Sequence, residues 1–106
     1  MIKYVNDKEL KEVLSSNKEL ILVFGKGLNC SVCSAVEDRV NSTYPAKFPN
    51  LKIYYINIHE NPEFRGQSLI FSVPTLMLYF EDKEVHRESR IIDFTKMENV
   101  INKFFN

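Results

Sequence analysis

The segment LILVFGKGLNCSVC, residues 20–33, decides the fold class of this 106-residue chain. Its first five residues are all apolar, which is typical of a strand that is buried on both faces of a sheet. Gly25 and Gly27 then loosen the chain, and Cys30 begins a segment in which apolar residues recur at helical spacing. The segment therefore predicts a central strand, a loop, and a helix that starts at the pair Cys30 and Cys33.

The chain after the cysteine pair predicts a second strand. The helix that connects the two predicted strands is expected to bury the face that carries Val32, Cys33, Val36 and Val40. Pro45 and Pro49 mark the end of this helix, unless Pro45 lies inside a kink. Residues 51–58 are rich in β-branched and aromatic side chains, which favour a strand. Because a helix connects the two strands, we expect a β-α-β unit with parallel strands.

Short signals on either side of this unit predict the remaining helices. Asn6 is a good N-cap, and Glu9 stands three residues later in the capping-box position. Asn61, followed by a proline, predicts the start of a short helix. Near the C-terminus, Asp93 or Thr95 caps a last helix with one apolar face.

An antiparallel hairpin completes the predicted fold. Residues 75–80 and 84–87 read as its two strands, joined by the polar turn at residues 81–83. The sequence contains no internal repeat and no linker, so we expect one domain across residues 1–106. The predicted fold class is α/β, with a central mixed sheet that is flanked by helices.

Charge and composition narrow the choice of partner and compartment. Fourteen basic and fourteen acidic side chains cancel, so the charge balance favours neither nucleic acid nor an anionic membrane. The first seven residues lack the pattern of a signal peptide, and no apolar run is long enough to span a bilayer. We therefore expect a cytoplasmic protein, acting as a monomer. In that reducing compartment, a C-x-x-C pair indicates redox chemistry or metal binding rather than a structural disulfide.

The order of elements and motifs resembles thioredoxin over almost the whole chain. A C-x-x-C pair near a β-α-β pattern is the motif of that family. The dipeptide Asn61-Pro62 and the segment VPTL, residues 73–76, stand at nearly the separations found in thioredoxin. Lys26 and the segment NCSVC, residues 29–33, look most like the small thioredoxin-like proteins of low-GC Gram-positive bacteria. The resemblance implies a thioredoxin-like fold with the C-x-x-C pair at a helix N-terminus.

Several positions depart from the thioredoxin pattern. Phe24 stands where thioredoxin has a buried aspartate, and Tyr55 stands where it has the lysine that partners this aspartate. The family's proton-handling pair is therefore missing from this chain. Asn29 and Lys26 replace two tryptophans of the active-site loop, and both residues between the cysteines differ as well. These departures bear on kinetics and substrates rather than on the fold.

The chemistry of disulfide exchange assigns different roles to the two cysteines. Exchange needs an accessible thiolate and a second thiol that releases the mixed disulfide. At the helix N-terminus, Cys30 faces unpaired backbone N–H groups and the positive end of the helix dipole, which favour a thiolate. Lys26 is a candidate to add to this effect. Cys33, one turn later, is the predicted resolving thiol, and Glu37 is a candidate to relay its proton.

The resemblance also implies a substrate groove. It implies that the peptide bond between Val73 and Pro74 of this chain is cis and faces the cysteines. The backbone of Val73 would then pair with an extended substrate segment. Asn29, next to the first cysteine, is a further predicted substrate contact.

The sequence therefore predicts a thiol–disulfide oxidoreductase that reduces protein or low-molecular-weight disulfides and needs no bound cofactor or metal. Its partners would be disulfide-containing proteins and a reductase that donates electrons. Two alternatives stay open. A metal-binding module would need ligands beyond the C-x-x-C pair, and His59 and His86, which we expect to be solvated, lack the paired spacing of a zinc site. A non-catalytic adaptor or redox sensor would hold a partner in the groove beside Pro74.

Overall fold

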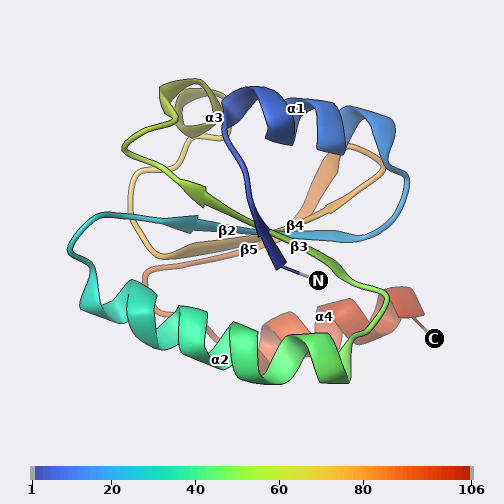
Figure 1. Ribbon diagram of the computed structural model, residues 1–106. Coiled ribbons are helices and arrows are strands. Elements are labelled where there is room, and N and C mark those ends of the chain that lie inside the picture. Colours follow the sequence, from blue (N-terminus) through green and yellow to red (C-terminus); the bar gives the residue numbers. More distant parts are fainter. Residues whose placement is uncertain (1, 106) are drawn as a thin grey trace.

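The computed structural model describes residues 2–105, which form five strands and four helices (Figure 1). In chain order these elements are β1 (Ile2–Tyr4), α1 (Asp7–Ser16), β2 (Ile21–Lys26), α2 (Ser31–Lys47), β3 (Lys52–Asn57), α3 (Pro62–Gln67), β4 (Thr75–Phe80), β5 (Lys83–Ser89) and α4 (Phe94–Phe105). The order matches the predicted one, with one added strand at the N-terminus.

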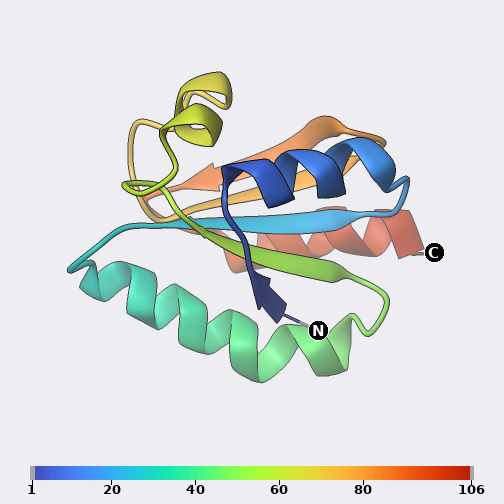
Figure 2. The same cartoon turned by 45° about the horizontal axis from the view of Figure 1, so that its top comes forward.

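The strands form one mixed sheet in the order β1-β3-β2-β4-β5. β1, β3 and β2 run parallel, whereas β4 is antiparallel to both β2 and β5. β2 lies at the centre, as its unbroken apolar run predicts. Helices α1 and α3 cover one face of the sheet, and α2 and α4 cover the other (Figure 1 and Figure 2). The fold is therefore the predicted sheet between two layers of helices.

The central strand divides its side chains between two cores. Leu22 and Phe24 pack in the core on the side of α2 and α4. Ile21 and Val23 pack in the core on the side of α1 and α3. This alternation is the two-residue period of a strand. Lys26 continues the first row, so its side chain lies on the α2 side of the sheet.

The structure departs from the prediction at the end of β2 and at the N-terminus. β2 extends two residues beyond its apolar run, because Lys26 still pairs with Asn57 of β3. The sequence pattern does not predict β1 at all. Its three residues are too few to show an alternation, and they form a strand because they pair with residues 53–55 of β3. Both differences arise from pairing between strands, and the pattern of one short segment does not show which strand it pairs with.

Helix α2 carries the cysteine pair at its N-terminus and continues past Pro45 to Lys47. Its buried side chains are those of Cys33, Val36, Val40 and Tyr44. The prediction that Val32 shares this face is wrong, because 53% of Val32 is exposed. Val32 precedes Cys33 by one residue, which turns its side chain about 100° around the helix axis.

The start of α3 also departs from its predicted cap. Asn61 makes no side-chain hydrogen bond to its own helix, and its Oδ1 instead accepts one from the backbone N–H of Asp7 at 2.8 Å. The Asp7 carboxylate accepts hydrogen bonds from the backbone N–H groups of Glu63 and Phe64, at 3.1 and 2.9 Å. Helix α1 therefore supplies the cap of α3, which satisfies N–H groups that have no partner inside the helix.

Other local signals are confirmed. Asn6 and Glu9 form the capping box of α1. Asp93, one of the two candidates, caps α4 by accepting a hydrogen bond from a first-turn N–H at 3.0 Å. The hairpin turn is one residue shorter than predicted. Glu81 and Asp82 have φ values of 52° and 64°, as expected for the two central residues of a type I′ turn.

Candidate active site

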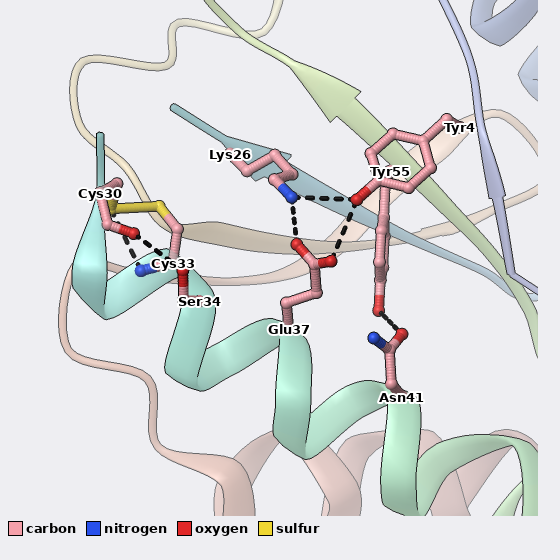
Figure 3. A network of polar contacts seen from close by, with 8 residues as sticks. All are labelled: Tyr4, Lys26, Cys30, Cys33, Ser34, Glu37, Asn41 and Tyr55. Atoms are coloured by element: carbon pink, nitrogen blue, oxygen red, sulfur yellow. Dashed lines mark hydrogen bonds and ion pairs between the residues drawn. A yellow bond between two sulfur atoms is a disulfide. The ribbon is translucent and has the colours of Figure 1, made fainter. Parts of the chain in front are cut away.

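The two cysteines lie at the N-terminus of α2 and form a disulfide, with Cα atoms 5.2 Å apart. Cys30 is the N-cap of the helix. Its sulfur accepts a hydrogen bond from the backbone N–H of Cys33 at 3.1 Å (Figure 3). In the reduced protein, a thiolate at Cys30 would receive the same donor and the favourable end of the helix dipole.

The two sulfurs differ in burial. Only 1% of Cys33 is exposed, and the residue belongs to the apolar core between the sheet and α2. Cys30 is partly buried and lies at the edge of that core. An incoming disulfide therefore meets Cys30 first, which suits an attacking thiol in front of a resolving one.

An open cavity of about 500 Å³ lies beside the sulfurs. Its lining consists of Lys26, Gly27, Asn29, Cys30, Ser31, Cys33 and Ser34. Asn29 adopts a left-handed backbone conformation, with φ of 52°, which asparagine tolerates better than most residues. This conformation turns the chain from β2 into α2. The cavity thus brings together four of the residues that the sequence predicts for the site.

The loop before β4 lies close to the loop that precedes Cys30. The peptide bond between Val73 and Pro74 is cis, the conformation that the thioredoxin resemblance implies. The side chain of Val73 packs against the same core as Cys30. A Cβ atom on Gly27 would lie only 2.8 Å from Val73 Cγ2. Glycine at this position therefore allows the two loops to approach each other closely.

Lys26 and Glu37, which the sequence offers as separate modulators of the cysteines, form an ion pair with each other. The ammonium of Lys26 also donates a hydrogen bond to the hydroxyl of Tyr4 at 3.0 Å (Figure 3). This hydroxyl donates in turn to the second oxygen of Glu37 at 3.1 Å. Burial works against the charge of Lys26, but hydrogen bonds with Glu37 and Tyr4 outweigh it and raise the pKa of Lys26. Tyr4 is missing from the sequence prediction, because the strand that carries it was not foreseen.

An aromatic pair occupies the positions where thioredoxin has its aspartate and lysine. Phe24 and Tyr55 are direct neighbours across β2 and β3. Their rings pack edge to face with centroids 5.1 Å apart, and neither residue is more than 1% exposed. The Tyr55 hydroxyl donates to Asn41 Oδ1 at 2.8 Å, and burial raises the pKa of Tyr55. The core behind Cys33 therefore holds a neutral phenol and no carboxylate at these positions.

The two histidines have different surroundings. His59 is exposed, as predicted. The prediction that His86 is solvated is wrong: its side chain is 16% exposed, and its Nε2 lies 2.6 Å from the carboxylate of Glu88. Glu88 stands two residues further along β5, on the same side of the strand, and is thus a local partner. Among residues 2–105, no three His, Cys, Asp or Glu side chains are grouped to hold a metal ion.

Comparison with known proteins places this arrangement in a family. The family model described as Thioredoxin matches residues 1–103. The chain belongs to the thioredoxin family. The thioredoxin-like protein YdfQ of Bacillus subtilis (strain 168) is 32% identical over 76 residues, which are 72% of this chain and 67% of that protein. The thioredoxin of Porphyra purpurea is 24% identical over 103 residues, which are 97% of this chain and 96% of that protein.

Solved structures show the same fold. A mutant thioredoxin from Halobacterium salinarum NRC-1 matches with a TM-score of 0.83 and 23% identity, and covers 99% of this chain and 91% of its own. The thioredoxin of Fasciola hepatica matches with a TM-score of 0.83 and 20% identity, and covers 98% of this chain and 99% of its own. Family membership and the C-x-x-C disulfide at the start of α2 together support thiol–disulfide oxidoreductase activity as the general function of this thioredoxin-family protein. None of the helices within residues 2–105 has the length and apolar content that a membrane span requires.

Proposed function

We propose that this thioredoxin-family protein is a reductase of protein or low-molecular-weight disulfides that works through Cys30 and Cys33. The observation that carries the proposal is the difference between the two sulfurs. Both cysteines line an open cavity, but Cys30 is partly buried and accepts a backbone N–H, whereas only 1% of Cys33 is exposed. We expect residues 1–106 to act as one monomeric domain in the cytoplasm, without a bound cofactor or metal.

The proposed cycle begins from the reduced protein. The Cys30 thiolate attacks one sulfur of the partner disulfide, and the other partner sulfur leaves as a thiolate that takes up a proton. Cys33 then gives up its proton, and its sulfur attacks Cys30 Sγ. The bond from Cys30 to the partner breaks, and the second partner sulfur leaves and is protonated. The partner gains two electrons and two protons, and the protein ends with the Cys30–Cys33 disulfide that the structure contains.

An external dithiol donor completes this cycle. Its two thiols would reduce the Cys30–Cys33 disulfide by the same exchange and would themselves become a disulfide. The glutathione and thioredoxin systems keep cytosolic thiols reduced, which favours reduction of partners over their oxidation. We therefore expect a reductase as the electron donor.

The loop that carries Val73 and Pro74 leaves backbone groups available to an extended partner segment. Within residues 2–105, the backbone N–H and C=O of Val73 make no hydrogen bond, so both are available to a partner strand. The carbonyl of Pro74 is already occupied, because it accepts from the N–H of Arg90 at 2.7 Å. Exposed apolar side chains at this end of the sheet include Leu28, Val32, Phe71 and Ile91, which are 61%, 53%, 85% and 88% exposed. We propose that Val73, Pro74 and Asn29 contact the partner near its disulfide.

The test compares the two cysteines by substitution. We expect Cys30→Ser to abolish reduction of insulin disulfides, and Cys33→Ser to keep a reactive thiol that stalls as a mixed disulfide. Mass spectrometry under non-reducing conditions detects the stalled adduct. Ser42→Ala, at an exposed position of the same helix outside the cavity, is the matched control and should keep its turnover. Faster alkylation of Cys33 than of Cys30 at neutral pH would show that the roles are reversed.

A second candidate function is a non-catalytic adaptor or redox sensor. The observation that favours it is the Phe24–Tyr55 pair, which leaves the core without the family's proton-handling groups. Such a protein would bind partners in the groove in one redox state and would not consume reductant. Steady consumption of a dithiol reductant by the wild-type protein in the presence of insulin would exclude this candidate.

A further inference from the structure

The resolving thiol has an electrostatic difficulty. Cys33 must lose its proton to attack Cys30, yet it lies in an apolar core with Val36 and Phe24. Apolar surroundings disfavour a thiolate. The positions in the sheet where the family keeps ionisable groups hold Phe24 and Tyr55 instead. Any charge that stabilises the Cys33 thiolate must therefore come from another place.

Lys26 brings a positive charge to the cavity that both cysteines line. It lies two residues after Phe24 on β2, and thus on the side of the sheet that faces α2. Lys26 lines the same cavity as Cys30 and Cys33. Figure 3 shows its side chain between the disulfide and the Tyr4 ring, with Glu37 below it on α2. Since 20% of the Lys26 side chain is exposed, bulk water screens its charge less than that of a surface lysine.

The groups around the ammonium keep it charged and hold it in place. From α2 it meets the carboxylate of Glu37, and from β1 the hydroxyl of Tyr4. From β3 it meets the Tyr55 ring, whose centroid is 6.0 Å away, and whose hydroxyl stays protonated because burial raises its pKa. The carboxylate of Glu37 offsets part of the positive charge. However, Glu37 is not part of the cavity lining, whereas Lys26 is.

We propose that Lys26, held by Glu37 and Tyr4, is a positioning residue that stabilises the Cys33 thiolate in the resolving step. This inference rests on the proposed reductase function and assigns the charge that its second step requires. In that step the Cys33 proton passes to water in the open cavity, and Lys26 keeps its own proton. The Cys33 sulfur then forms its bond to Cys30 Sγ while the Cys30–partner bond breaks. The departing partner sulfur takes a proton from water, so the step is balanced. In this arrangement Glu37 holds the lysine, and the carboxylate itself takes no proton.

The decisive measurement is the pH dependence of Cys33 alkylation in the Cys30→Ser background, where Cys33 is the one remaining cysteine. We expect Lys26→Met, which keeps the apolar stem and removes the charge, to raise the midpoint by about one pH unit. This corresponds to about tenfold less thiolate near neutral pH. Lys26→Arg restores the charge and should restore the midpoint. Glu37→Gln removes the opposing charge, while Tyr4 still holds the lysine, and should not raise the midpoint.

Two results would overturn this inference. One is an unchanged midpoint in Lys26→Met. The other is a midpoint that rises as far in Glu37→Gln as in Lys26→Met, because the carboxylate would then be the group that matters. Thermal unfolding of each variant checks that the fold is intact, and the rescue by arginine separates charge from packing.

The measurement is also independent of the proposed reductase function, because it needs no partner disulfide. If Lys26→Met shifts the midpoint of Cys33 alkylation but the wild-type protein does not reduce disulfides, only the proposed reductase function is contradicted. Normal turnover with an unshifted midpoint would remove the role of Lys26 alone. In the full dithiol protein, Lys26→Met should move the rise of turnover with pH in the alkaline direction.

Discussion

The two halves of helix α2 carry polar clusters with similar parts and different surroundings. In the first half, Glu37 meets the ammonium of Lys26 and the hydroxyl of Tyr4. We call these three residues the cysteine-side cluster. It joins α2 to β2 and β1, and it borders the cavity that Cys33 lines. The carboxylate of Glu37 is 23% exposed, so water still reaches this cluster.

In the second half of α2, the helix-clasp cluster consists of Arg39, Tyr44, Lys47 and Glu98. Glu98 comes from α4, and its side chain is only 8% exposed. It accepts hydrogen bonds from Lys47 at 2.6 Å, from Arg39 at 3.1 Å and from the Tyr44 hydroxyl at 3.3 Å. Here the carboxylate fastens two helices together, far from any sulfur along the helix.

The difference between the two clusters teaches that composition alone does not assign a role. Both contain a carboxylate, a lysine and a tyrosine hydroxyl. One borders the cavity of a residue whose charge must change during the proposed reaction, and the other connects two helices. Substitutions in the cysteine-side cluster should therefore change rates and leave stability nearly intact. Substitutions in the helix-clasp cluster should do the reverse.

The largest expected effect comes from placing a new carboxylate in the core, outside both clusters. We expect Phe24→Asp to lose about 3–5 kcal/mol of unfolding free energy, because a fully buried ring is lost and a carboxyl group enters without a partner. Urea unfolding measures this loss. Phe24→Leu, which changes the shape but adds no charge, should lose about 1.5 kcal/mol or less. A loss below about 1 kcal/mol for the aspartate variant would mean that the core accepts a charge at this position, and would weaken the case for Lys26.

The next largest effect compares the carboxylates of the two clusters. We expect Glu98→Gln to lose about 1–3 kcal/mol of unfolding free energy, because charge-assisted hydrogen bonds from Lys47 and Arg39 are weakened. Disulfide reduction by this variant should be unchanged. Glu37→Gln is the matched substitution in the cysteine-side cluster and should lose less than about 1 kcal/mol, as expected for a partly exposed pair. Equal losses in the two variants would remove the distinction between the clusters.

The acid side of the pH dependence gives a second check on Glu98. Burial raises the pKa of this carboxyl, but hydrogen bonds and charges from Lys47 and Arg39 outweigh burial and lower it overall. A folded-state pKa below the unfolded value means that Glu98 stabilises the fold fully above its ordinary pKa of about 4.3 and loses this effect as pH falls through the folded value. The difference in unfolding free energy between wild type and Glu98→Gln should therefore shrink on acidification. A difference that grows in acid would contradict the assigned direction.

Local signals in the sequence were sufficient for much of the fold and for the two sulfurs. The apolar run ending at Phe24 predicted the central strand, and the spacing of Cys30 and Cys33 predicted their place at the start of a helix. The spacing of Asn6 and Glu9 predicted the capping box in the same way. Each of these features depends on residues within about one helical turn of one another. Features that depend on residues close together along the chain can therefore be predicted from a single sequence.

The partners of Lys26 required information of another kind. The pair with Glu37 depends on β2 continuing to Lys26, and the bond to Tyr4 depends on β1 pairing with β3. Both are consequences of strand register, which joins residues that are far apart along the chain. Asn61 shows the same limit, since the cap of its helix comes from Asp7. The sequence named Lys26 and Glu37 as candidates, but their joint arrangement needed the tertiary structure.

The smallest expected effects come from removing one hydroxyl group from each cluster. Tyr44 is fully buried and its hydroxyl donates to Glu98, so Tyr44→Phe should lose about 0.5–1.5 kcal/mol of unfolding free energy. It should leave the pH midpoint of Cys33 alkylation unchanged. Tyr4 is 57% exposed, so Tyr4→Phe should change the unfolding free energy by less than about 0.5 kcal/mol. Because Lys26 then loses one of its two fixed acceptors, we expect a small alkaline shift of the Cys33 midpoint in the Cys30→Ser background. Both quantities are measured on the same protein samples, by urea unfolding and by alkylation. A shift of Cys33 in Tyr44→Phe as large as that in Tyr4→Phe would show that ionisation follows general packing of α2 rather than the position of one ammonium group.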